Sequence, residues 1–256
     1  MPLNSSLRVV IPARYGSQRL PGKPLIDLGG KPMIVRVHEA VVSALGPVDV
    51  TVAVDDLRVL DVVSAAGLSA VMTRSTWESG TDRVAEVARI QGWRADDVII
   101  NVQGDEPLVP ALLLQEFAKL CLSSRDFQMG TVCAPVTERR DLADPNVVKV
   151  LLDKRSDAVA FSRAAIPYNR DRPIHDWVLS DYKRHLGIYG YRNETLQTLT
   201  SEPLCDMERI EKLEQLRALW LGIPIRVLQW ESTPPAGVDT QADADRVRAF
   251  LRDQLN

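Results

Sequence analysis

Strand-like and helix-like segments alternate through the first half of this chain, and no other feature constrains the fold as strongly. Apolar runs predict buried strands at residues 8–13, 48–54, 68–72 and 97–102. Helices are predicted between them, at residues 32–44, 56–66 and 82–90. Strands that alternate with helices form a parallel sheet whose two faces are covered by those helices. We therefore predict an α/β fold with a mainly parallel sheet flanked by helices.

The alternation loosens after about residue 130. Further strands are predicted at residues 129–134, 147–152, 158–161, 186–191 and 225–230. Helices are predicted at residues 207–221 and 242–255, whereas residues 167–181 are polar and turn-rich. With no repeat and no linker, we interpret residues 1–256 as a single domain that carries a β-rich insertion at about residues 130–190. The basic residues in or near this insertion are interpreted as ordinary surface charges, although any of them could help hold the carboxylate of an acidic substrate; they are Lys149, Arg163 and Lys183.

The composition excludes several classes of protein. With 256 residues, of which 45% are hydrophobic and 25% charged, the chain is long enough to bury a hydrophobic core. Its net charge of -3 argues against general nucleic-acid binding, which needs a basic face. The sequence shows no apolar signal core at its start and no run of about 18 apolar residues that could span a membrane. Because Cys121, Cys133 and Cys205 form no CxxC pair, we expect neither a disulfide scaffold nor a zinc site, and we expect a cytoplasmic location.

A cationic loop, defined here as residues 14–23, follows the first predicted strand. In open α/β sheets ligands bind at the carboxyl ends of the strands, which draws attention to this loop and to the loop after residue 102. Arg14, Arg19 and Lys23 are interleaved with glycines and a serine, so backbone N–H groups and cations can both approach a polyphosphate. The spacing of a Walker A loop is absent. The alternative is a solvated basic surface loop.

Asp105 stands just past the fourth predicted strand, in the sequence Asn-Val-Gln-Gly-Asp-Glu-Pro. Magnesium takes carboxylate oxygens, commonly one or two together with phosphate, so Asp105 suits a metal site. Gly-Asp-Glu-Pro is also good turn chemistry, and Asp caps helices. The neighbouring Gln103 and Gly104 can contact a ligand or simply form the turn.

Several segments together resemble the family of 3-deoxy-manno-octulosonate (KDO) cytidylyltransferases. They follow the family's order, at residues 10–25, 30–34, 101–107, 184–191, 210–217 and 237–240. The resemblance extends from about residue 8 to the last predicted helix, and residues 170–182 depart from it. It implies a sugar-nucleotidyltransferase fold of the GT-A-like type. It also implies a homodimer, formed partly through the β-rich insertion, which would contribute to sugar binding as well.

The resemblance implies a role for each matching residue. Lys23, Arg19, Asp105 and Asp239 would be catalytic, and Asp105 and Asp239 would bind Mg²⁺. Nucleotide binding would fall to Arg14, Ser17, Lys23, Ser79, Gly80, Thr81 and Arg83, with residues 79–81 lining the cytosine pocket. The sugar acid would contact Arg19, Gln103, His185, Tyr189, Glu214 and Gln215.

The residues themselves leave several of these roles open. On a helix over residues 207–221, Glu214 and Gln215 lie opposite an apolar side that includes Ile210, so they can be solvated or can roof a cleft. His185 can be a structural hydrogen-bonding residue. Asp239 can favour the dipole of the last helix. However, Thr240 with Asp243 three residues later can cap that helix, which leaves Asp239 for another task.

The reaction that the resemblance implies joins CTP and KDO. The anomeric 2-hydroxyl of KDO attacks the α-phosphorus of CTP, pyrophosphate leaves, and CMP-KDO supplies lipopolysaccharide synthesis. One Mg²⁺ at the two aspartates would bind the sugar, and a second would bridge the phosphates. The alternatives are activation of 8-amino-KDO or sialic acid, and a non-catalytic nucleotide or sugar-acid sensor on the same fold. The expected partners are CTP, KDO and a second copy of the chain, and neither nucleic acid nor membrane.

Overall fold

β1 (Leu7–Ala13) lies in the interior of the sheet, and its alternating side chains explain why helices cover both faces. Val9 and Ile11 join one hydrophobic cluster, whereas Val10 joins a second cluster on the opposite face. All three side chains are fully buried, as expected for a central strand. The computed structural model describes residues 6–17, 19–77 and 79–253.

The strands of the first half are parallel to one another, as predicted. β1 pairs with β2 (Asp49–Val54) on one side and with β4 (Val98–Asn101) on the other. β3 (Ala70–Met72) pairs with β2 and forms this edge of the sheet. Their carboxyl ends therefore lie along a single edge, where the loops that follow them can meet.

The strands of the second half make the sheet mixed. β8 (Lys183–Arg192) is antiparallel to β4 and to β5 (Met129–Pro135), and β9 (Ile225–Gln229) is parallel to β5. β6 (Lys149–Leu152) pairs with β8 and forms a hairpin with β7 (Ala158–Ser162). The order across the main path is β3-β2-β1-β4-β8-β5-β9. The predicted α/β class is confirmed, and the β-rich segment at about residues 130–190 is continuous with the main sheet.

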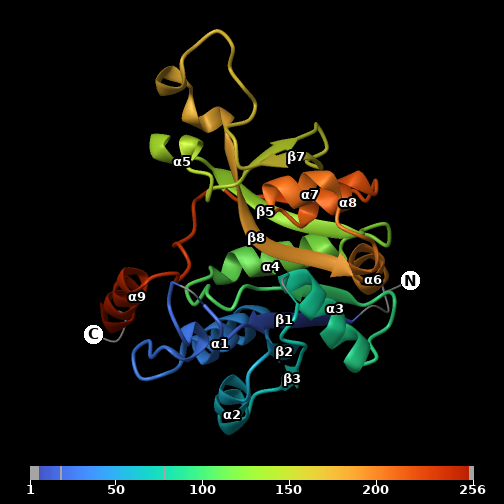
Figure 1. Ribbon diagram of the computed structural model, residues 1–256, viewed down its shortest axis with the longest axis vertical. Coiled ribbons are helices and arrows are strands. Elements are labelled where there is room, and N and C mark those ends of the chain that lie inside the picture. Colours follow the sequence, from blue (N-terminus) through green and yellow to red (C-terminus); the bar gives the residue numbers. More distant parts are fainter. Residues whose placement is uncertain (1–5, 18, 78, 254–256) are drawn as a thin grey trace.

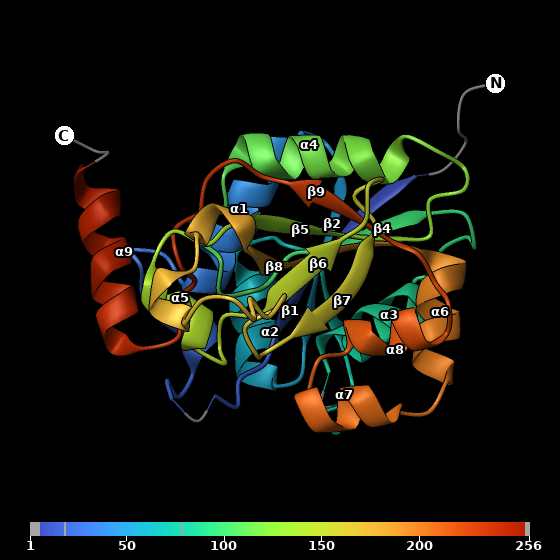
Figure 2. The same cartoon turned by 90° about the horizontal axis from the view of Figure 1, so that it is seen from above.

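Helices cover both faces of this sheet, as predicted. The cluster around Val9 receives side chains from α1 (Met33–Leu45), α2 (Leu57–Ala65), α4 (Ala111–Leu122) and α9 (Gln241–Asp253). The opposite cluster receives side chains from α3 (Gly80–Ile90), α6 (Asn193–Ser201) and α8 (Gln215–Trp220). Figure 2 shows α1 and α4 on one side of the strands and α3, α6 and α8 on the other. No helix is predicted from the sequence at α4 or α6, and the predicted end of the last helix at residue 255 lies outside the described residues.

Shorter elements complete the chain. They are η1 (Lys23–Leu25), α5 (Arg139–Ala143), η2 (Ile174–Asp176), η3 (Leu179–Asp181) and α7 (Asp206–Glu211). Within residues 6–17, 19–77 and 79–253, every helix is too short or too polar to cross a bilayer.

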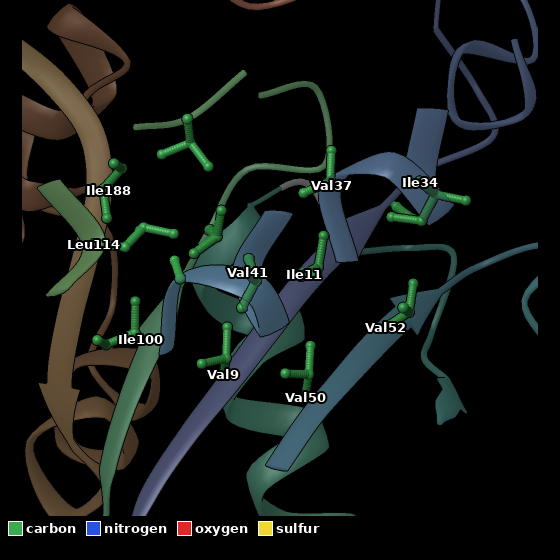
Figure 3. Close-up of a cluster of buried hydrophobic side chains, with 14 of the residues drawn as sticks. Val9, Ile11, Ile34, Val37, Val41, Val50, Val52, Ile100, Leu114 and Ile188 are labelled. Carbon is green, nitrogen blue, oxygen red and sulfur yellow. The ribbon is translucent and has the colours of Figure 1, made fainter. Parts of the chain in front are cut away.

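Figure 3 shows the core between α1 and the parallel strands. Val9, Val52 and Ile100 stand on the strands and Ile34 and Val41 on α1, and each of the five side chains is fully buried. Full burial of such a side chain contributes about 1.5–3 kcal/mol. This packing fixes the parallel half of the sheet on which the site is built.

The predicted continuous helix over residues 207–221 is wrong, because the chain forms two short helices, α7 and α8. α7 ends where Lys212 adopts a left-handed conformation, with φ of 54°. The Nε of Arg163 donates to the carbonyl of Glu211 at 2.6 Å, so this carbonyl is already bonded at the helix end. Ile210, which the continuous helix would place on its apolar side, is 70% exposed on α7.

Between β7 and β8 the chain extends away from the sheet, and Figure 1 shows this excursion at the top in yellow to orange. It packs on itself, with the rings of Trp177 and Tyr182 stacked at 5.2 Å.

The interpretation of Lys149 as a surface charge is wrong. Its side chain is fully buried, and its Nζ donates to the carbonyl oxygens of Asp144, at 3.0 Å, and Val147. Burial lowers the pKa of Lys149, and the two backbone carbonyls accept from two of its three N–H donors.

Candidate active site

The cationic loop and the loop after β4 enclose a cavity of about 520 Å³ at the carboxyl ends of β1 and β4. Gly104 permits this approach, because a Cβ there would lie 2.4 Å from the carbonyl oxygen of Pro12. A larger residue would push the β4 loop away from the cationic loop. Among the residues that line the cavity are Arg14, Ser17, Arg19, Lys23, Gly80, Gln103, Asp105 and Asp239.

Lys23 lies between the two aspartates of the predicted metal site. Its Nζ donates to Oδ2 of Asp105 at 2.5 Å and to Oδ1 of Asp239 at 2.8 Å. Because both oxygens contact one nitrogen, they cannot be farther apart than the sum of these distances. The structure thus brings Asp105 and Asp239 together beside the cationic loop.

A backbone contact explains how Asp239 reaches Asp105. The N–H of Val238 donates to the carbonyl of Asp105 at 2.8 Å, which holds the chain before α9 against the loop after β4. Gly237 allows the close approach, since a Cβ there would lie 3.1 Å from the same carbonyl oxygen. The neighbouring carboxylate is thereby directed at Lys23.

The cap of α9 leaves Asp239 free for this contact, and the predicted cap is confirmed. The N–H of Thr240 donates to Oδ2 of Asp243 at 2.9 Å, and the N–H of Asp243 donates to Oγ1 of Thr240 at 3.3 Å. Asp239 instead pairs with Arg19, whose Nη2 lies 3.0 Å from its Oδ2. Arg19 and Lys23 of the cationic loop therefore both contact the carboxylate of Asp239.

Electrostatics keep Lys23 charged. Burial lowers the pKa of Lys23, but the charges and hydrogen bonds of Asp105 and Asp239 outweigh burial and raise it above the usual lysine value. An ammonium has three N–H donors, and the two carboxylates use two of them. One donor remains for a phosphate oxygen.

The start of α3 faces the same cavity. Gly80 lines it and also lines a smaller cavity of about 190 Å³. Ser79 caps the helix, since its Oγ accepts from the N–H of Asp82 at 3.0 Å. The buried Thr81 donates its hydroxyl to Glu214. Within residues 79–81, Gly80 is therefore the residue that faces both cavities.

Arg83 does not take the direct nucleotide-binding position that the resemblance implies. Its side chain is fully buried, with Nη1 donating to Oγ1 of Thr73 and Nη2 to Oδ2 of Asp55, each at 3.0 Å. Arg83 is not among the described residues that line the three cavities of this site. A guanidinium held in this way organises the protein around the site.

Two further cavities adjoin the first. One of about 420 Å³ shares Arg19, Asp105 and Asp239 with it. The cavity of about 190 Å³ shares Gly80 and Gln103 with it. His185 lines both further cavities, and the smaller one also contains Tyr189, Glu214 and Gln215. All the residues predicted to contact the sugar thus line one connected set of cavities.

His185 is held as a neutral ring. Burial lowers the pKa of His185 to about 3. Its Nε2 is hydrogen-bonded to Oγ1 of Thr131 at 2.9 Å, and its ring lies 5.3 Å from that of Tyr189 and 5.2 Å from that of Phe161. A neutral imidazole in this position can contact a sugar hydroxyl and is a poor general base.

Residues at the start of α8 line the smaller cavity. The polar side of this helix is expected from the sequence either to be solvated or to roof a cleft, and the structure favours the cleft. Gln215 is only 3% exposed and its Nε2 has no hydrogen-bond partner among the described residues, so a solvated surface position is wrong for it. Burial raises the pKa of Glu214, which accepts from the N–H of Thr81 at 3.4 Å. Both side chains can therefore meet ligand hydroxyls.

Three polar residues that line these cavities have no role predicted from the sequence. Asn101 ends β4, and its buried Oδ1 has no hydrogen-bond partner among the described residues. Arg184 directly precedes His185 on β8, and its buried Nε is likewise unpaired in the described part. Burial raises the pKa of Glu106 to about 7, and the charges of Asp105 and Asp239 act in the same direction. Asn101 ends β4 and Glu106 lies in the loop after it, so the rule that ligands bind at strand ends could have predicted both residues.

Comparisons with known proteins agree with this geometry. The cytidylyltransferase family model matches residues 8–225. The chain is 54% identical over 248 residues to the 3-deoxy-manno-octulosonate cytidylyltransferase 2 of Paraburkholderia phytofirmans, with 96% of this chain and 94% of that protein covered. It is 45% identical over 241 residues to the 3-deoxy-manno-octulosonate cytidylyltransferase of Acinetobacter baumannii, with 93% and 95% covered.

Solved structures give the same result. A structure of CMP:2-keto-3-deoxy-manno-octonic acid synthetase complexed with CTP has a TM-score of 0.88 and 41% identity, with 98% of this chain and 100% of that chain covered. A cytidylyltransferase from Leptospira borgpetersenii, 16% identical with a TM-score of 0.64 over 98% of this chain and 88% of that chain, shows the shared fold alone. The chain therefore belongs to the cytidylyltransferase family, among the 3-deoxy-manno-octulosonate cytidylyltransferases, and is a nucleotidyltransferase.

Proposed function

We propose that this enzyme transfers CMP from CTP to the anomeric 2-hydroxyl of KDO, giving CMP-KDO and pyrophosphate. The observation that carries the proposal is the placement of Lys23 between Asp105 and Asp239, on a cationic loop that lines the same cavity. The names of the relatives support KDO as the acceptor, and the relative complexed with CTP supports the nucleotide.

The cationic loop is suited to the charge that this reaction moves. A bond forms from the hydroxyl oxygen to the α-phosphorus, the bond from that phosphorus to the bridging oxygen breaks, and the hydroxyl proton is lost. Negative charge grows on the leaving pyrophosphate. Arg14, Arg19 and Lys23 line the cavity that would receive it, and Lys23 is held in place by its two carboxylate partners. Such preorganised cations need little rearrangement during the reaction.

Asp105 and Asp239 fit a Mg²⁺ ion, because their oxygens already converge on a single cationic group, the ammonium of Lys23. Within the described residues, no group of three or more His, Cys, Asp or Glu side chains is arranged to hold a metal. Two carboxylates suffice, since magnesium usually takes its other ligands from water and substrate phosphates. When bound, Mg²⁺ supplies charge neutralisation and lowers the pKa of a bound hydroxyl.

The two adjoining cavities are proposed to hold the sugar acid. Gln103, His185, Tyr189, Glu214 and Gln215 line the smaller one. The unpaired Nε2 of Gln215 can donate to a hydroxyl that it meets there. A sugar in these cavities would lie next to Asp105 and Asp239, which also line the larger adjoining cavity. The acceptor hydroxyl and the triphosphate would thus be held side by side, which removes much of the entropic barrier.

We also propose that two copies of the chain associate and that the product supplies lipopolysaccharide synthesis in the cytoplasm. For the dimer, the support is a group of exposed apolar residues near β7 and α7, with Val159, Met207 and Ile210 exposed at 58%, 44% and 70%. For the compartment, the support is that all three cysteines are free and buried. The lipopolysaccharide role rests on the family resemblance.

Pyrophosphate release tests the reaction. The purified enzyme is assayed with Mg²⁺, with CTP, UTP, ATP or GTP as donor and KDO, 8-amino-KDO or sialic acid as acceptor. We expect CTP with KDO to be fastest. ATP and GTP should be slower by roughly tenfold to 100-fold, because a buried polar group left unpaired costs about 1–3 kcal/mol.

Other outcomes of this assay separate the alternatives. Faster release with 8-amino-KDO or sialic acid would assign the site to that sugar. CTP binding without release for any acceptor would indicate a sensor. Equal rates with CTP and ATP would contradict the proposed base recognition.

A further inference from the structure

The carboxylate of Asp55 joins two parts of the nucleotide site. Asp55 follows β2 directly, at the sheet edge where the cationic loop and α3 meet. Its Oδ1 accepts from the backbone N–H of Tyr15 at 2.9 Å, and its Oδ2 accepts from Nη2 of Arg83 at 3.0 Å. The side chains of Asp55 and Arg83 are 11% and 0% exposed, so this ion pair is shielded from water.

Arg83 extends the link to the loop before α3. Its Nη1 donates to Oγ1 of Thr73 at 3.0 Å, and its Nη2 also donates to the carbonyl of Trp77 at 3.3 Å. The hydroxyl of Thr73 donates in turn to the carbonyl of Val54 at 2.9 Å. One buried network therefore ties together the loops that follow β1, β2 and β3.

Each end of this network lies next to a residue that lines the 520 Å³ cavity. The amide that Asp55 binds belongs to Tyr15. The residue before it, Arg14, lines the cavity on the side of the cationic loop. Gly80 lines the cavity at the start of α3, three positions before Arg83. The network thus fixes the separation between a residue proposed to bind phosphate and the segment proposed to bind cytosine.

We propose that Asp55 is a positioning residue that holds the base-binding and triphosphate-binding parts of the site at the separation that one CTP molecule spans. This inference rests on the proposed function, because it takes CTP as the ligand. A ligand that bridges two subsites binds well only when their separation matches its length. A ligand that occupies one subsite does not depend on that separation.

The test compares a bridging ligand with its two fragments. Asp55→Asn keeps an oxygen for the Tyr15 amide and removes the negative charge opposite Arg83. Calorimetric titrations of the wild type and the variant use CTP, CMP and pyrophosphate, each with Mg²⁺. We expect the CTP affinity to fall about tenfold to 100-fold, and the CMP and pyrophosphate affinities to change less than about threefold.

Asp97→Asn is the matched control, since Asp97 is a buried carboxylate at the opposite edge of the sheet. Asp97 accepts from the backbone N–H of Ser6 at 3.1 Å and of Arg94 at 3.2 Å. We expect this variant to lower thermal stability without a selective loss of CTP affinity. If Asp55→Asn does not fold, Arg83→Lys tests the same link, because lysine keeps the charge but lacks the fork that reaches both Asp55 and Thr73.

Three outcomes would overturn the inference. They are an unchanged CTP affinity in the folded variant, an equal loss for CTP and both fragments, and the same selective loss in Asp97→Asn. A wild-type protein that binds no CTP would instead overturn the proposed function, and this inference with it. The wild-type titration therefore separates the two failures.

Discussion

Lys23 is the residue on which both halves of the site converge, so its replacement tests the site most directly. In Lys23→Ala the leaving pyrophosphate loses a positive charge, and Asp105 and Asp239 lose their common partner. We expect turnover in pyrophosphate release to fall roughly 100-fold or more, as for removal of one preorganised electrostatic group. Lys31→Ala is the control, because Lys31 pairs with Glu39 at the exposed surface. Near-normal turnover in Lys23→Ala would reduce the cationic loop to a surface feature.

The two aspartates should each be indispensable for turnover and dispensable for folding. Asp105→Asn and Asp239→Asn keep the shape of the side chain but remove the charge that a magnesium ion requires. We expect pyrophosphate release to be abolished while the thermal unfolding temperature stays close to that of the wild type. Asp245→Asn serves as the control, since this carboxylate lies on the exposed side of α9 and pairs with Arg248. Substantial turnover in either site variant would argue against a shared metal.

His185 gives the site a contribution to stability that depends on pH. Burial lowers its pKa to about 3, against 6.5 for an unperturbed histidine. Between these values the unfolded chain binds more protons than the folded one. The free energy of unfolding therefore rises with pH over this window, and the contribution is complete above pH 6.5.

His185→Gln should flatten this dependence. Between pH 7 and pH 5 the wild type should lose up to about 2 kcal/mol more than the variant, measured by urea denaturation at each pH. His175→Gln is the control, because that imidazole is 72% exposed and should leave the profile unchanged. Parallel profiles for His185→Gln and the wild type would contradict the assigned burial.

At the scale of elements, hydrophobic periodicity is sufficient to predict a strand or helix where a single apolar run forms that element. It predicts β1, β2 and α1 nearly to their ends. It fails at residues 207–221, because a side chain distant in sequence, Arg163, binds the last carbonyl of α7, and no local pattern encodes that contact. It also misses α4, where consecutive leucines obscure the helical period.

The break between α7 and α8 is stabilised by a buried ion pair, and this leads to a prediction. Glu208 and Arg217 form two hydrogen bonds of 2.7 Å, and both side chains are nearly inaccessible. Glu208→Ala should lower the free energy of unfolding by about 3–5 kcal/mol, because it leaves a buried guanidinium without a counter-charge. It should also raise KM for KDO more than KM for CTP, since α8 carries Gln215 at the cavity proposed to hold the sugar acid.

Urea denaturation and substrate titrations measure the two effects. Asp206→Ala is the control, because its pair with Arg209 on α7 is exposed and contributes little. Equal stability of the Glu208 and Asp206 variants would show that the pair does not hold the two helices.

At the scale of the whole molecule, the site depends on contacts between segments far apart in the sequence. The rule that ligands bind at strand ends finds Asp105 without any family argument. Asp239 enters only through the resemblance, because its position depends on the bond from Val238 to the carbonyl of Asp105. The same rule could have drawn attention to Asp55 after β2. Its inward contact with Arg83 follows from tertiary packing, which the sequence does not display.

The last prediction concerns association of two copies. Among the described strands β7 pairs only with β6, so one of its edges carries no strand partner, and Val159 on it is 58% exposed. Ser162 of β7 donates to Glu211 of α7 at 2.7 Å, which holds α7 and its exposed Ile210 next to this strand. An unpaired strand edge beside exposed apolar side chains favours pairing with a second copy.

Val159→Lys and Ile210→Glu should therefore convert a dimer into a monomer, because each would place a charge in the apolar contact. Light scattering after size exclusion should give twice the chain mass of 28.5 kDa for the wild type and the single-chain mass for the variants. Leu112→Glu is the control, since Leu112 is similarly exposed, at 57%, but belongs to α4 on the opposite face of the sheet. A monomeric wild type would rule out the dimer, and variants that stay dimeric would move the interface away from β7 and α7. Val159 and Ile210 are not among the described residues that line the three site cavities. The monomeric variants should therefore still release pyrophosphate.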